Sequence, residues 1–333
     1  MSVDRGPVGG PTLWRRLASN LSGLRRCRRN DGCRVDCDHD RTDDGRLPWD
    51  GAGYGGWGGH EYHGTDPGVE RPPVIFVHGN QRDACDWEVH ADFFANRAYG
   101  GDELWAITFG SGSPSHDAMA DQLDHFVGHV RDRTGADEVA VVGHSLGVTG
   151  LRYWLCRDDR LDWVDSFVGL AGANHGTVLS SLAARAGLNG GTYKMSNFLR
   201  DDYERLDDHP LSTLNENETP GDVDYYTIRG TNDPLFWNCT DSPALTGAEN
   251  VAIEADHDGV RTSLTSAEYV FEWCSGEKPY NFRNLYGTGD VDGEDAGESA
   301  SADGMAHTTA GERAGAGDAD GAGDRESGAH SGT

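Results

Sequence analysis

The sequence predicts an α/β fold, a mostly parallel β-sheet covered on both faces by helices. Two observations lead to this prediction. Short, wholly apolar runs alternate with stretches of helical periodicity between about residues 72 and 276, and such alternation is typical of buried parallel strands joined by helices. One of the apolar runs also leads directly, through the glycine-flanked turn Gly143–Gly147, into a helical stretch.

Strands are expected where several apolar residues follow one another, because strands covered on both faces lack polar alternation. Helices are expected where apolar residues recur at three- and four-residue spacing. The predicted strands are Val74–Val77, Leu104–Phe109, Val139–Val142, Phe167–Ala171, Tyr225–Ile228 and Val251–Ile253. The predicted helices are Ser115–Asp132, Val148–Cys156 and Ala267–Cys274.

Segments of biased composition flank this region, which we delimit as one domain of residues 71–276. Residues 1–70 are rich in Gly, Asp and Arg. Their run Gly51–Gly59 is unsuited to a helix or strand interior, because glycine loses much conformational freedom on ordering. From about Gly289 onward the chain consists mainly of Gly, Ala, Asp, Glu and Ser and lacks the apolar side chains of a core. We therefore expect a low-complexity, partly disordered N-terminal segment and a disordered acidic C-terminal tail over residues 277–333.

The 333-residue chain is strongly acidic, with 56 Asp and Glu against 28 Lys and Arg and a formal net charge of −28. Such a chain repels phosphate, which excludes a general nucleic-acid binder. It contains no run of about 18 apolar residues, which excludes a multi-pass membrane protein. The lysines are only Lys194 and Lys278. High acid content with few lysines is typical of halophilic proteins, whose self-repulsion is screened by molar salt.

The N-terminal segment has leucines at helical spacing between Leu13 and Leu24, among many arginines. This pattern is compatible with weak contact between a basic helix and an anionic membrane surface, and a solvated tail is the alternative. No continuous apolar stretch follows the twin arginines, so we expect a cytoplasmic protein, with secretion left open. Zinc binding is a minor alternative, because the nearby ligands match no established spacing. These ligands are Cys27, Cys33, Cys37 and His39.

The turn after the third predicted strand has the form G-x-S-x-G, with Ser145 between Gly143 and Gly147. The two glycines remove side chains that would collide with the neighbouring strand and helix, so the serine hydroxyl projects into open space. The following helix points its N-terminus at the same place. We therefore expect Ser145 to be a nucleophile, whereas His144 cannot reach round to its own serine.

A serine nucleophile needs a base and an acid that orients the base. In this strand–turn–helix arrangement they follow the serine in the order acid, then histidine. Asp233 follows the fifth predicted strand and His257 the sixth, so both are expected at the same edge of the sheet as Ser145. We predict that these three residues form a catalytic triad. Asp241 is the rival acid and His175 the rival histidine.

Attack by a serine creates an oxyanion that needs hydrogen-bond donors. One donor is expected from the backbone N–H of Leu146, which follows the nucleophile. The other is expected from the loop after the first predicted strand, where we choose the N–H of Asn80 and hold Gln81 as its rival. We expect His78 to fix this loop rather than to transfer protons.

Four segments of the predicted domain carry a resemblance to a known family, namely Val77–Asn80, Gly143–Gly147, Gly172–Thr177 and Gly230–Asp233. They resemble the small α/β-hydrolase lipases of bacteria and an extracellular polyhydroxybutyrate depolymerase related to them. The resemblance covers about residues 72–276 and implies an α/β-hydrolase fold. It also implies hydrolysis of carboxylic esters through an acyl-serine intermediate, with no cofactor and no metal. Such lipases are usually secreted, so the lack of a clear signal peptide is a departure.

In such relatives a cysteine after the acid loop can pair with one near the end of the domain, and Cys239 and Cys274 are the corresponding pair here. The segment Leu179–Asp224 is longer than a simple crossover. Its apolar residues are expected either to form a flap over the serine or to belong to a crossover packed on the sheet. These residues are Leu182, Leu188, Met195, Phe198 and Leu199.

The function that these patterns favour is hydrolysis of a small-molecule or lipid ester by a monomeric serine hydrolase of the lipase type. A polyhydroxyalkanoate depolymerase or a thioesterase is the alternative substrate class. A non-catalytic binding protein of the same fold is the second alternative. Neither a nucleic acid nor a cofactor is expected as a partner.

Overall fold

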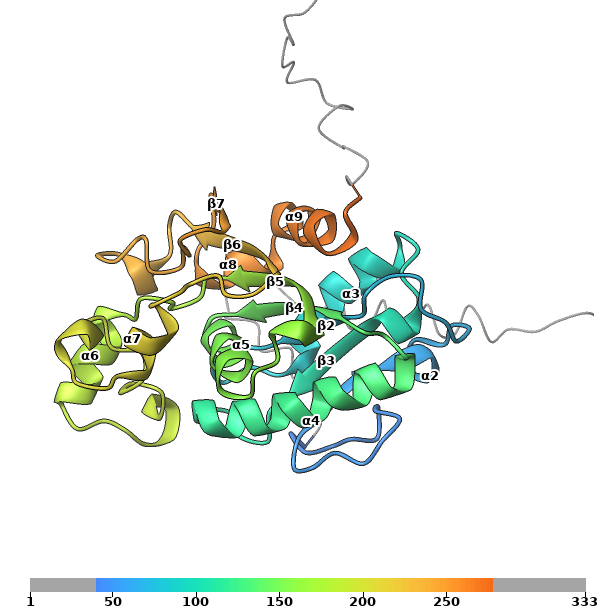
Figure 1. Ribbon diagram of the computed structural model, residues 1–333, viewed down its shortest axis with the longest axis horizontal. Helices are drawn as coiled ribbons and strands as arrows, with labels where there is room; N and C mark the ends of the chain where they lie inside the picture. Colours follow the sequence, from blue (N-terminus) through green and yellow to red (C-terminus); the bar gives the residue numbers. More distant parts are fainter. Residues whose placement is uncertain (1–39, 278–333) are drawn as a thin grey trace, which may run out of the picture. The chain divides into compact units, whose positions relative to one another are not determined.

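The computed structural model describes residues 40–277, and their core is a seven-stranded sheet (Figure 1). The strand order is β1-β3-β2-β4-β5-β6-β7, with β1 antiparallel to β3 and the remaining pairs parallel. The strands are β1 Gly55–Gly58, β2 Val74–Val77, β3 Leu104–Thr108, β4 Val139–His144, β5 Val164–Leu170, β6 Asp224–Gly230 and β7 Glu249–Ile253. The six predicted strands all form, with ends shifted by up to three residues.

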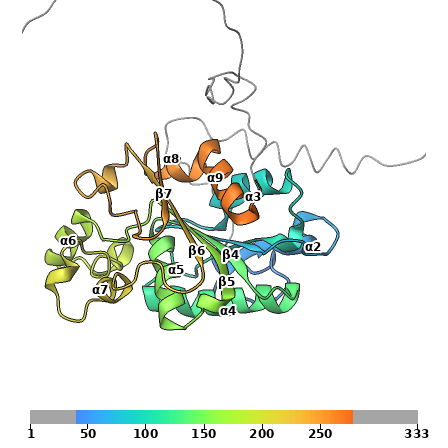
Figure 2. The same ribbon diagram turned by 45° about the horizontal axis from the view of Figure 1, so that its top comes forward.

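Helices cover both faces of the sheet (Figure 2). Helices α4 (His116–Thr134) and α5 (Leu146–Arg157) pack against each other on one face, and α3 (Glu88–Ala95) and α9 (Leu264–Ser275) lie on the other. Helix α4 begins at a Ser115 cap and ends at Gly135, which has the left-handed conformation that favours glycine. The shorter helices are α2 Gly59–His63, α6 Val178–Arg185, α7 Pro210–Leu214 and α8 His257–Thr262.

The short strand β1 lies within the glycine-rich run for which we expected neither helix nor strand, so that expectation is wrong. Trp57 of this strand is fully buried in the core. The glycines are required for close packing rather than for flexibility. A Cβ at Gly56 would clash with the Ala106 carbonyl, and a Cβ at Gly58 would lie 2.8 Å from the Leu104 carbonyl oxygen. The sheet therefore begins upstream of residue 71, where we placed the start of the domain.

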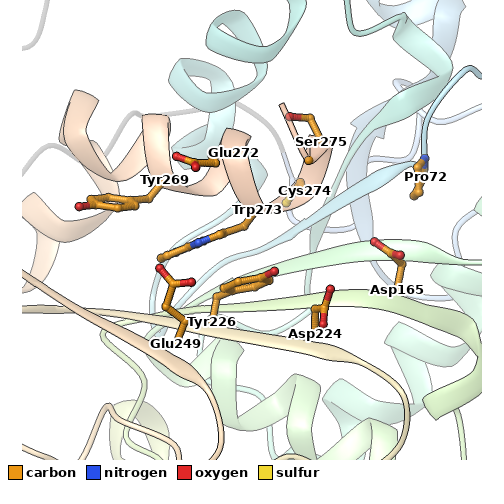
Figure 3. A pocket seen from close by; sticks show the side chains of 11 residues that line it. Pro72, Asp165, Asp224, Tyr226, Glu249, Tyr269, Glu272, Trp273, Cys274 and Ser275 are labelled. Atoms are coloured by element: carbon orange, nitrogen blue, oxygen red, sulfur yellow. The ribbon is translucent and has the colours of Figure 1, made fainter. Parts of the chain in front are cut away.

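The cysteines Cys239 and Cys274 are both free, so the disulfide that the resemblance implied is absent. Cys274 on α9 lines a pocket with Asp165 and Asp224, at the amino-terminal ends of β5 and β6 (Figure 3). Cys239 follows β6 and therefore lies beyond the carboxyl end of the same sheet. Cys85, by contrast, is disulfide-bonded.

Several expectations concern residues outside the described range. These are the leucine-rich N-terminal helix, the zinc ligands between Cys27 and His39, and the disordered tail. Within residues 40–277, no helix combines the length and apolar character needed to cross a membrane.

Candidate active site

The turn at Ser145 joins the carboxyl end of β4 to the first residue of α5. Ser145 has φ 55° and ψ −119°, a strained conformation for a residue with a side chain. Both flanking glycines are sterically required. A Cβ at Gly147 would lie 2.6 Å from the carbonyl oxygens of Val77 and His78, and a Cβ at Gly143 would lie 3.0 Å from the Val148 nitrogen. The chain therefore holds the serine on a tight elbow between a strand and a helix.

The structure brings together the three residues of the predicted triad. The Ser145 hydroxyl lies 2.9 Å from Nε2 of His257, and Nδ1 of His257 lies 2.7 Å from Oδ2 of Asp233. The other oxygen of Asp233 accepts the backbone N–H of Leu235 at 2.9 Å. The Asp233 side chain is 1% exposed and that of His257 is 23% exposed. This places a shielded carboxylate behind an imidazole that remains open to a substrate.

The rival residues lie elsewhere. His175 follows β5, and its Nε2 is bound to Glu218 at 3.1 Å. Asp241 lies further along the loop after β6, and it is Asp233 that bonds to His257. The arrangement thus favours the predicted acid and histidine over both rivals.

The histidine of the elbow has a role that we did not anticipate. Nε2 of His144 donates to the backbone carbonyl of His257 at 3.0 Å, and the centroids of the two imidazole rings lie 4.9 Å apart. Burial, followed by the nearby His257, holds the pKa of His144 well below its usual value. A neutral His144 therefore anchors the backbone of His257 beside the nucleophile.

A sequence profile described as lipase (class 2) matches residues 71–258 of this chain. The chain belongs to the class 2 lipase family. The solved structures similar to it include Bacillus licheniformis lipase BlEst2 in its mature form, at 18% identity, with 59% of this chain and 91% of that chain covered and a TM-score of 0.46. Aspergillus fumigatus lipase B is 15% identical, with 65% of this chain and 56% of that chain covered and a TM-score of 0.50.

The likeness to lipase B shows the fold, which is the predicted α/β-hydrolase fold. The family match makes this class 2 lipase a hydrolase of the lipase and esterase kind.

The loop after β2 in this class 2 lipase passes close to Ser145. A Cβ at Gly79 would lie 3.1 Å from the Ser145 Cβ. The backbone N–H of Gln81 donates to the Gly112 carbonyl at 2.6 Å. Because this N–H already has an acceptor, the geometry favours Asn80 as the oxyanion donor. Ser113, which the sequence did not single out, donates its hydroxyl to the Asn80 side chain at 2.5 Å. Leu146 is the first residue of α5, where backbone N–H groups lack helical partners.

His78 fixes this loop, as expected. Its Nε2 accepts the backbone N–H of Phe109 at 3.0 Å, and its Nδ1 donates to the Gly79 carbonyl at 2.7 Å. Burial, with a further contribution from Arg41, lowers the pKa of His78 to about 3. The imidazole is therefore neutral and keeps one acceptor and one donor nitrogen.

The insertion between β5 and β6 contains α6 and α7, which lie together at one end of the molecule (Figure 1). The reading as a packed crossover holds for a part of its apolar residues, and the flap over the serine stays a prediction. Met195 and Leu199 are buried in the core, whereas Leu182 and Leu188 are exposed. The insertion also reaches the site, because the Asn80 side-chain amide donates to the Thr192 carbonyl at 3.3 Å.

Within the described residues, one group of side chains has the chemistry of a metal site, namely His60, Glu61 and Asp102. Its ligand atoms are already engaged. Nδ1 of His60 is bound to Asp102 at 2.8 Å, and Glu61 pairs with Arg133. Asp102 also accepts two backbone N–H groups, from His60 and Gly68. The group is accounted for as a hydrogen-bonded cluster beside β1.

Proposed function

We propose that this protein hydrolyses carboxylic esters through an acyl-enzyme, with Ser145, His257 and Asp233 as its catalytic triad. The observation that carries the proposal is the continuous hydrogen-bond chain from Asp233 through His257 to Ser145. Membership of the class 2 lipase family supports it.

The tautomer of His257 follows from its partners. Asp233 accepts from Nδ1, so the ring proton is held there and Nε2 is left to accept the Ser145 proton. As Ser145 Oγ attacks the ester carbonyl, Nε2 takes the proton. The shielded carboxylate of Asp233 stabilises the imidazolium that forms. His257 then gives the proton to the leaving alcohol, and the acyl group stays on Ser145.

Deacylation repeats these steps with water as the nucleophile. His257 takes a proton from the water, the acyl–oxygen bond to Ser145 breaks, and the serine regains its proton. In both halves the negative oxygen is bound by the N–H groups of Asn80 and Leu146. Loss of one such donor costs about 3 kcal/mol of transition-state stabilisation in serine hydrolases.

The substrate class that the surface favours is an ester of poor water solubility. Leu179, Leu182 and Leu188 of the insertion are between 46% and 59% exposed, and Thr192 of the same insertion contacts Asn80. Exposed apolar side chains next to a catalytic site suit contact with lipid. We therefore propose a lipid ester as substrate.

The test is a Ser145→Ala variant compared with the wild type in molar salt, with p-nitrophenyl esters of increasing chain length, triglyceride, polyhydroxybutyrate and acyl thioesters. We expect the variant to lose all ester hydrolysis and all labelling by a fluorophosphonate while its melting temperature is unchanged. Undiminished turnover in the variant would refute the proposed nucleophile. Faster hydrolysis of polyhydroxybutyrate or acyl thioesters than of lipid esters would replace the proposed substrate class. A wild type that neither hydrolyses any of these substrates nor reacts with the fluorophosphonate would indicate a binding protein.

A further inference from the structure

Residues 40–54, which we call the strap, precede β1 and carry an arginine whose contacts converge on the loop behind the active site. Nε of Arg41 donates to the Phe109 carbonyl at 2.9 Å, and Nη2 donates to the Arg82 carbonyl at 2.6 Å. The same Nη2 lies 3.4 Å from Nε2 of His78. One guanidinium therefore touches three backbone or ring atoms contributed by two different loops.

Two of the three acceptors flank the candidate oxyanion donor in the chain. His78 lies two residues before Asn80 and Arg82 two residues after it, so the guanidinium contacts both sides of the loop. Phe109 follows the neighbouring strand β3 and is itself bonded to His78 through its N–H. Arg41 thus ties the loop that carries Asn80 to the end of an adjacent strand.

The strap is seated by its own apolar residues, of which Tyr54 is buried in the core and Trp49 stacks on Trp105, and also by close backbone contacts at two glycines outside it. A Cβ at Gly55 would lie 2.7 Å from the Arg41 carbonyl oxygen, and a Cβ at Gly110 would clash with the Gly53 carbonyl. The two glycines allow the strap backbone to approach β1 and the loop after β3 closely. This fixes the Cα of Arg41, and a planar guanidinium with five donors can then bind several acceptors at set angles.

Arg82 extends the connection to the other side of the site. Its side chain pairs with Asp258 at 2.7 Å, and Asp258 directly follows His257. The backbone carbonyl of the same residue is held by Arg41. Consecutive polar contacts therefore link the strap, the loop that carries Asn80 and the start of α8.

We propose that Arg41 is a positioning residue for the oxyanion hole, holding the Asn80 N–H at the place where the negative oxygen develops. The inference rests on the proposed function. Arg41 touches no reacting atom and acts only through the loop. Because the oxyanion forms in the transition state, a displaced donor lowers kcat and leaves ground-state binding nearly unchanged.

The experiment compares Arg41→Ala, Arg41→Lys, Thr42→Ala and Ser145→Ala with the wild type on a soluble p-nitrophenyl ester. Thr42 is the matched control because it is the adjacent strap residue, and its exposed hydroxyl bonds locally to Asp40. We expect Arg41→Ala to lower kcat about tenfold, less than the roughly hundredfold cost of a full 1 Å misplacement, with KM within about twofold of wild type. Arg41→Lys should recover part of the loss, because one ammonium replaces fewer of the guanidinium contacts.

Two further measurements separate positioning from general destabilisation. Affinity for an alkyl boronic acid, which forms a charged tetrahedral adduct on the serine, should fall in parallel with kcat. Methylguanidinium should restore activity to Arg41→Ala and have no effect on Thr42→Ala. Wild-type kcat in Arg41→Ala alongside an inactive Ser145→Ala would overturn the inference and leave the proposed function standing. An unrescued loss that follows a fall in melting temperature would also overturn it, whereas an active Ser145→Ala would remove the proposed function itself.

Discussion

Replacement of Asp233 by asparagine is expected to disable the site by reversing the tautomer of His257. Oδ1 of Asp233 accepts the Leu235 N–H, so the amide oxygen of an asparagine must occupy that position. The NH2 group then faces Nδ1 of His257, where Oδ2 now lies at 2.7 Å. Nδ1 is forced to accept, the ring proton moves to Nε2, and Nε2 can no longer take a proton from Ser145.

The magnitude follows from the known cost of the wrong tautomer in serine hydrolases, about 10⁴-fold in kcat. At 1.36 kcal/mol per factor of ten this is about 5.5 kcal/mol of transition-state stabilisation. The side chains are nearly isosteric, so the melting temperature should change little.

The assay is steady-state hydrolysis of a p-nitrophenyl ester by Asp233→Asn, with Asp241→Asn as the matched control on the same loop. We expect the control to retain wild-type kcat. A kcat for Asp233→Asn within tenfold of wild type would refute the tautomer argument. A loss confined to the Asp241 variant would identify the rival acid instead.

Two predictions concern stability. Gly147→Ala should destabilise the fold by about 3 kcal/mol, because the new Cβ meets two backbone carbonyls that cannot move aside. The control Gly128→Ala in α4, where the nearest atom to a new Cβ lies at 4.0 Å, should stabilise the fold by up to about 1 kcal/mol. Equal melting temperatures for the two variants would contradict the steric argument. Burial, then Arg261, lowers the pKa of His90 to about 3, and within the described residues neither ring nitrogen has a hydrogen-bond partner. Stability from the neutral ring is therefore present above about pH 6.5 and lost as the pH falls towards 3, so His90→Phe should gain relative to wild type by about 1.4 kcal/mol per pH unit below 6.5. Denaturant unfolding between pH 5 and 7 measures this, and a constant difference across that range would refute it.

The parts of the fold that the sequence predicts are those in which burial leaves a local pattern. Strands β2, β3 and β4 lie in the middle of the sheet and are buried along their whole length, so they appear as continuous apolar runs. The carboxyl ends of parallel strands meet at one edge of a sheet. For this reason, the order of Ser145, Asp233 and His257 along the chain is enough to suggest that they meet.

The parts that the sequence does not predict depend on atoms contributed by distant segments. The run Gly55–Gly58 looks flexible by composition, yet it forms strand β1. Its glycines are needed there because neighbouring backbone and side-chain atoms occupy the places where Cβ atoms would lie. Arg41 leaves no pattern either, since its acceptors are two carbonyls and one histidine nitrogen. In the insertion, hydrophobicity alone cannot separate Leu182, which is 57% exposed, from Leu199, which is 6% exposed.

The contacts of the buried arginines explain one part of the charge composition. In a chain with 28 basic residues and only two lysines, arginine supplies the internal basic donors. Arg152 and Arg261 are almost fully buried and bond to the carbonyls of Leu214 and Asp86, as Arg41 does to those of Phe109 and Arg82. Bonds to neutral carbonyls are screened by salt far less than repulsion among surface carboxylates. Added salt should therefore raise the stability of this protein while leaving the geometry around Ser145 unchanged, which fits the expectation that it works in concentrated salt.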